Sequence, residues 1–241
     1  MLSKVTKPID LSITIAGDRN DSQKHSLIAK VKSEGYYVPQ VVSQDTDRIT
    51  RIDGCASSVS FVDAQSKYSR EFAQCFGLAA IGQSREVDEH LSFLFHGNPE
   101  YFMRKKRELH SVLIDRLREL SDRSSPDSVS VVIFAGETTP YWLAEERMYA
   151  GRIDFLSGII REGAGVIPQI MRPKFSRPFN TEFYLDTPKC QAVLVQPDPV
   201  TIKPRDIFSA DRVACEQLRW RMLARQVLKE PLSGCYLFQE W

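Results

Sequence analysis

The chain has little that would place it in a membrane, in a secreted disulfide-bonded class or on nucleic acid. Its longest apolar run is far too short to span a bilayer, and its N-terminus lacks the apolar core of a signal peptide. The 32 basic and 31 acidic residues nearly cancel, which excludes a general electrostatic footprint for nucleic acid. At 241 residues the chain can still build one large core, or two lobes of about 120 residues each.

Cysteine and histidine are sparse, and neither is spaced as a metal site requires. The cysteines are odd in number, widely separated and without a Cys-x-x-Cys pair, which predicts reduced core residues and a cytoplasmic location. The four histidines show no metal-ligand spacing and are expected on surfaces or helix faces. The phosphate-loop, Gly-x-Ser-x-Gly and His-Glu-x-x-His motifs are absent as well. We therefore expect no metal and no cofactor.

The first half of the chain alternates strand-like and helix-like segments. Strand-like patterns cover residues 11–16, 36–42 and 58–62, and helix-like patterns cover residues 22–34, 45–55 and 69–82. Pro39 moves the second of these strands toward the edge of its sheet. Strands and helices alternating at this spacing predict an α/β fold with a mainly parallel, Rossmann-like sheet flanked by helices.

The second half begins after a polar, linker-like segment at residues 121–130, so the predicted domains are 1–122 and 123–241. A helix is expected at residues 99–123, before the linker. Strands are expected at residues 129–135, 166–171, 182–185, 190–195 and 234–241, and helices at 141–161 and 208–230. The sequence Ile15-Ala16-Gly17-Asp18 is echoed by Phe134-Ala135-Gly136-Glu137. This echo favours two similar lobes, although short matches also arise by chance.

Candidate chemistry lies in polar residues at the predicted carboxyl ends of strands, where open α/β sheets bind ligands. Glu71 is expected in the first turn of a helix opening at Ser69, and Asp63 directly follows a strand. Gly17, Asp18 and Arg19 follow the first strand, where a glycine lets the backbone approach a ligand. A carboxylate in a partly dry pocket can attack an anomeric carbon, and a second acid can protonate the departing base. First-turn and turn-forming roles are the structural alternatives for these residues.

Residues 12–82 resemble the nucleoside 2-deoxyribosyltransferase superfamily. The opening Ile15-Ala16-Gly17 and the strand at residues 59–63 with its terminal acid match that family, and Glu71 falls where its catalytic Glu lies. The segment at residues 66–71 is also similar to the Ser-aromatic-Glu region of Toll/interleukin-receptor-like NAD hydrolases. The resemblance implies cleavage of an N-glycosidic bond and a site completed by a neighbouring subunit, that is, a homo-oligomer.

Three functions follow from these observations. The first is cleavage or transfer of an N-glycosidic bond in a nucleoside, nucleotide or NAD. Glu71 would be the nucleophile or charge stabiliser, Asp63 would hold ribose hydroxyls or supply a proton, and residues 17–19 would bind sugar or phosphate. The second is a non-catalytic nucleotide sensor with its ligand between two lobes, as in tandem-lobed sensors of bacterial defence. The third is a structural or assembly protein with an α/β core.

Overall fold

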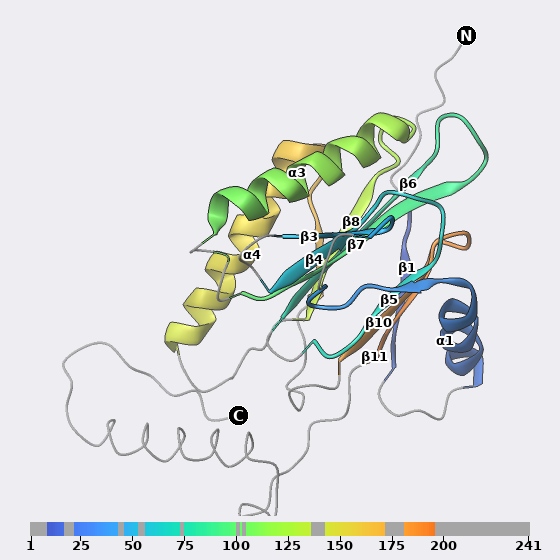
Figure 1. Cartoon of the computed structure of the whole chain (residues 1–241), viewed down its shortest axis with the longest axis horizontal. Coiled ribbons are helices and arrows are strands. Elements are labelled where there is room, and N and C mark those ends of the chain that lie inside the picture. The colour runs from blue at the N-terminus through green and yellow to red at the C-terminus, as the bar shows by residue number, and fades with distance from the viewer. Residues whose placement is uncertain are drawn as a thin grey trace, which may run out of the picture.

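The computed structural model of the chain describes residues 9–16, 22–42, 46–52, 56–72, 75–99, 102, 105–135, 143–171 and 181–195. This part forms four layers, in the order helices, sheet, sheet, helix (Figure 1). The helices are α1 (Ser22–Glu34), α3 (Lys106–Arg123) and α4 (Leu143–Ala164). No helix of the described part is long and apolar enough to cross a bilayer.

Two mixed sheets form the inner layers. Sheet A has the strand order β1 (Ser12–Ala16), β11 (Gln191–Val195), β10 (Glu182–Asp186), β5 (Lys67–Ser69), β2 (Tyr36–Tyr37). Sheet B has the order β3 (Ile49–Arg51), β4 (Ser57–Ser60), β7 (His90–Gly97), β6 (Phe76–Gln83), β8 (Ser130–Ala135), β9 (Gln169–Met171). The pairs β1–β11, β2–β5 and β8–β9 are parallel, and the six other described pairs are antiparallel. The fold is therefore α/β as predicted, but the prediction of a mainly parallel sheet was wrong.

Side-chain alternation along sheet B separates two cores. On β6, Phe76 and Leu78 face α3 and α4, whereas Ala79 and Ile81 face sheet A. The helix α1 lies on the outer face of sheet A, where the Lys30 ammonium pairs with the Asp186 carboxylate at 2.8 Å. The layer between the two sheets is thus closed on both sides by hydrogen-bonded strands, and it holds the polar groups considered below.

Two predicted helices are strands in the structure. Residues 45–55 include β3, and residues 69–82 include the end of β5 and most of β6. All residues of β6 except Gln83 are buried, because helices cover one face and sheet A the other. A strand buried on both faces reads as a nearly continuous apolar run, and part of that run coincides with helical spacing. The helix at residues 22–34, the edge position of β2 and the strands β1, β4, β8, β10 and β11 were predicted correctly.

The described parts of residues 1–122 and 123–241 share both sheets. In sheet A, β1 pairs with β11, and in sheet B, β6 pairs with β8. The predicted boundary at residue 122 therefore does not divide these strands into two separate sheets, and the internal repeat stays a prediction. The elements expected at residues 208–230 and 234–241 lie outside the described residues.

Gly77 is required by the packing of Phe134 across the sheet. A Cβ at Gly77 would lie 2.1 Å from Cζ of Phe134, whose ring stacks on Phe183 at 4.0 Å. We expect Gly77→Ala to lower the free energy of unfolding by about 1–3 kcal/mol, the usual cost of overpacking a core. Gly151→Ala is the control, because a Cβ there meets nothing within 4 Å and alanine favours the helix. Urea denaturation measures both, and a Gly77→Ala protein as stable as the parent would contradict this packing.

Candidate functional site

Glu71 does not lie in a helix. It follows β5 in an exposed segment, with a φ of 64° that non-glycine residues seldom adopt. Its neighbour Arg70 pairs with Glu182, at 3.2 Å between Nε and Oε1, and not with Glu71. The exposed carboxylate therefore lacks the dry surroundings that the predicted nucleophile requires. Gly17, Asp18 and Arg19 lie outside the described residues.

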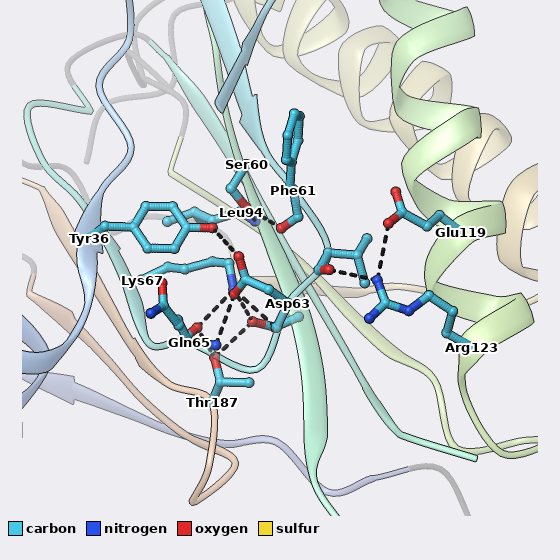
Figure 2. A network of polar contacts seen from close by, with 12 residues as sticks. Tyr36, Ser60, Phe61, Asp63, Gln65, Lys67, Leu94, Glu119, Arg123 and Thr187 are labelled. Atoms are coloured by element: carbon cyan, nitrogen blue, oxygen red, sulfur yellow. Dashed lines mark hydrogen bonds and ion pairs between the residues drawn. The ribbon is translucent and has the colours of Figure 1, made fainter. Parts of the chain in front are cut away.

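Asp63 is the second predicted acid, and it belongs to a polar network rather than to an open site (Figure 2). Its Oδ1 accepts from the Lys67 ammonium at 2.7 Å, and its Oδ2 accepts from the Tyr36 hydroxyl at 2.9 Å. Lys67 also donates to the Gln65 carbonyl and to the Ser92 hydroxyl, at 2.8 and 2.9 Å. Asp63 and Glu71 are therefore not brought together by any interaction of the described residues.

The Lys67 side chain joins the two sheets. Lys67 lies on β5 of sheet A and is 0% exposed, whereas Ser92 lies on β7 of sheet B. Burial lowers the pKa of Lys67 to about 8, and the attraction of Asp63 offsets only part of that effect. The three ammonium protons of Lys67 are donated to Asp63, Gln65 and Ser92, and no part of the Lys67 side chain is exposed. The network is therefore a structural link between the sheets.

A second polar group in the same layer is His96. Its Nδ1 lies 2.8 Å from the Ser69 hydroxyl oxygen, and Ser69 also contacts the Val38 carbonyl oxygen. That carbonyl only accepts, so the single hydroxyl proton of Ser69 is donated to Val38. His96 must then carry its proton on Nδ1 and donate it to Ser69. The lone pair of His96 is consequently on Nε2.

The Nε2 atom of His96 is buried and has no hydrogen-bond partner among the described residues. His96 is 0% exposed, and the Phe72 ring stacks on it with centroids 4.0 Å apart. Burial lowers the pKa of His96 to about 3, so the ring is neutral near pH 7. An unsatisfied buried nitrogen costs about 1–3 kcal/mol. Such a group in a folded protein calls for an explanation, and a functional role is one of those expected.

Cys75 lies on the same face of sheet B as this histidine, and its thiol makes no hydrogen bond with Nε2. Gly77 pairs with His96 across the β6–β7 ladder, and Phe76 pairs with Gly97. Cys75 and His96 are thus diagonal neighbours, which lie about 7–8 Å apart in antiparallel sheets. Cys75 packs in the cluster that includes Phe72, the residue stacked on His96. Cys75 is a free thiol, 5% exposed, and burial raises its pKa to about 12.

The low pKa of His96 predicts an acid-sensitive fold. The unfolded chain binds a proton near pH 6.5 and the folded chain only near pH 3, so the unfolded state gains protons first as the pH falls. We expect this residue to lower the free energy of unfolding by up to about 1.4 kcal/mol per pH unit below pH 6.5. Urea denaturation between pH 4.5 and 7.5 measures the slope. His96→Gln should reduce it, whereas substitution of the exposed His25 by glutamine should not. An unchanged slope in His96→Gln would contradict the neutral, buried ring.

Sequence reasoning missed Cys75 and His96, because it took the first for a helical core residue and the second for a surface residue. In the sequence, Ser69, Cys75 and His96 flank two apolar runs. Their spacing indicates a shared sheet face only when these runs are known to pair as antiparallel strands. Among the described residues, no group of three or more His, Cys, Asp or Glu side chains is placed to hold a metal ion. No family model, no curated protein and no solved structure matches this chain.

Proposed function

We propose that the protein is a thiol enzyme that transfers or hydrolyses acyl groups, with Cys75 as nucleophile and His96 as general base. The observation that carries the proposal is the buried, unpartnered Nε2 of His96 on the same sheet face as the Cys75 thiol. A nucleophile, a base and a third group that orients the base form the general pattern of such sites. Ser69 is the third group, because it holds Nδ1 of His96.

In each half of the proposed reaction, Nε2 of His96 accepts one proton and then donates it. The Cys75 sulfur bonds to the carbonyl carbon of the substrate while the thiol proton passes to His96 Nε2. The tetrahedral intermediate then expels its leaving group, which takes that proton from Nε2. Water next bonds to the acyl carbon of the thioester and gives a proton to Nε2, and the departing sulfur recovers it. The net change is hydrolysis of an ester, thioester or amide.

Both groups are uncharged in the resting protein, since the pKa of Cys75 is raised to about 12 and that of His96 is lowered to about 3. Charge therefore forms on both only when a polar carbonyl group is bound, and the two opposite charges then stabilise one another. The 5% exposure of Cys75 favours a small acyl group over a bulky one. The thiols of Cys75 and Cys190 are free, as in proteins of a reducing compartment, which agrees with the proposed cytoplasmic location.

N-glycosidic cleavage receives less support from the geometry. That reaction needs a sheltered carboxylate, but Glu71 is exposed and Asp63 is bound to Lys67 and Tyr36. A nucleotide sensor with its ligand between two Rossmann-like lobes is also less supported, because the described halves share both sheets. Nucleosides, nucleotides and NAD remain useful as comparison substrates, since release of a base from them would favour the glycosidic reaction.

Trapping of an acyl-enzyme tests the proposal. The protein is mixed with p-nitrophenyl acetate, quenched with acid, and its acetylated cysteine is located by peptide mass spectrometry. We expect acetylation of Cys75 ahead of Cys190, although Cys190 is the more exposed thiol and has the lower pKa, about 11. Exposure and pKa alone favour Cys190, so modification of Cys190 without Cys75 would overturn the proposal.

A further inference from the structure

The Phe72 ring covers one face of the His96 imidazole. The centroids of the two rings are 4.0 Å apart and their planes are inclined by 19°, so the rings are nearly parallel. Both side chains are buried, with Phe72 2% and His96 0% exposed. An imidazole makes its hydrogen bonds in the plane of its ring, so a ring stacked on its face does not compete for the lone pair of Nε2.

Phe72 is held in this position by its backbone and by its side chain. Its backbone amide donates to the Thr181 carbonyl at 3.2 Å. Its ring meets the Phe134 ring edge to face, with centroids 5.2 Å apart and planes at 73°. Phe134 has room there because Gly77, which pairs with His96 across the β6–β7 ladder, carries no side chain. The stack of Phe72 on His96 is therefore fixed by its surroundings.

A stacked aromatic ring affects the two charge states of histidine differently. The face of a phenyl ring carries negative electrostatic potential and attracts a cation within about 6 Å of its centroid, most strongly where water is excluded. A neutral imidazole gains little from this attraction, whereas an imidazolium gains it in full. His96 is neutral in the resting protein and becomes an imidazolium when it takes the thiol proton of Cys75 in the proposed reaction. The contact therefore stabilises the charged step more than the resting state.

We infer that Phe72 is a positioning residue of the proposed thiol site, and that its ring face stabilises the imidazolium form of His96. In that step the S–H bond of Cys75 breaks and the sulfur bonds to the carbonyl carbon of the substrate. The π electrons of the carbonyl group move to its oxygen, and the proton is bound by Nε2. Phe72 exchanges no proton or electron, so the reaction requires an aromatic face at this position and not merely an apolar side chain. The inference rests on the proposed acyl-transfer function.

Fluorination of the Phe72 ring separates its electrostatic effect from its packing. Each fluorine withdraws electron density from the ring face but changes the volume of the ring little. We expect mono-, di- and trifluorinated phenylalanine at position 72 to slow acetylation of Cys75 by p-nitrophenyl acetate stepwise, on the order of 10-fold in all. Phe72→Leu keeps an apolar side chain but has no ring face, so its loss should be at least as large.

The same fluorinated series at Phe134 is the matched control. Phe134 is buried and contacts the Phe72 ring, but its own stacking partner is Phe183, at 4.0 Å. Acetylation of Cys75 should stay within about twofold in this series, and the thermal unfolding midpoint of each protein shows whether it folds. Equal rates throughout the Phe72 series, or equal falls in both series, would overturn the inference and leave Cys75 as nucleophile. Failure of the parent protein to acetylate Cys75 would overturn the proposed function itself.

Discussion

Replacing Cys75 by alanine is expected to abolish acyl transfer, with a loss in kcat on the order of 10⁴-fold or more, because the covalent intermediate cannot form. The fold should survive, since the thiol makes no hydrogen bond with a described residue and alanine suits a buried apolar position. Truncation leaves a small cavity, at a cost of about 1 kcal/mol. Release of p-nitrophenol under steady-state conditions measures the activity, and urea denaturation measures the stability.

Cys190→Ala is the matched control for this substitution. Cys190 is half-buried, and its thiol contacts the Thr187 carbonyl oxygen at 3.9 Å in the turn between β10 and β11. Ser69, which contacts His96, instead pairs with Phe183 at the other end of β10. Its replacement should leave both the rate and the acetylated residue unchanged. Ser69→Ala should retain Cys75 but release Nδ1 of His96, so its rate should fall between those of the parent and Cys75→Ala. A Cys75→Ala protein with parental activity would eliminate the thiol mechanism.

Asp63→Asn is expected to destabilise the fold by about 3 kcal/mol at pH 7. The substitution removes the one carboxylate that pairs with Lys67, whose side chain is 0% exposed, and leaves the ammonium with neutral partners only. Breaking a buried pair in this way costs about 3–5 kcal/mol. The lower end of this range applies because the Asp63 side chain is 30% exposed, so solvent already weakens its electrostatic attraction to the Lys67 ammonium.

The partner substitution separates charge burial from lost packing. Lys67→Met removes the buried cation, and Asp63 then keeps the Tyr36 hydroxyl and its contact with water. We expect a smaller loss, about 1–2 kcal/mol, and a double variant that is more stable than Asp63→Asn alone. Asp115→Asn, on the exposed face of α3, is the control and should change stability by less than about 0.5 kcal/mol. Asp63→Asn as stable as this control would show that the network contributes nothing.

Local signals in the sequence predicted the fold where one face of an element meets solvent. The helix at Ser22–Glu34 has an exposed side and a stop at Gly35. The error at residues 69–82 has a physical cause. Residues 76–82 are buried on both faces, and Phe72, Cys75 and Leu78 fit a helical period only by coincidence.

The surroundings of the predicted site residues could not be read from the sequence. Asp63 was expected to act on a substrate, but Lys67, only four residues away, engages it. Glu71 was expected at a sheltered helix start, and it lies on an exposed segment once that helix is replaced by strand β6. Cys75 and His96 are 21 positions apart in the sequence, and nothing local connects them before β6 and β7 pair.

The sequence by itself determined an α/β chain with nearly balanced charge and most of its described strands, because composition and apolar period act locally along the chain. Tertiary structure decided the strand order, the burial of Lys67, the contact of His96 with Ser69 between the two sheets, and the placement of Cys75 on the same sheet face as His96. Those features depend on which strands pair and in what register. Pairing is set by the packing of distant segments, and a shift of one residue would send each of these side chains to the other face.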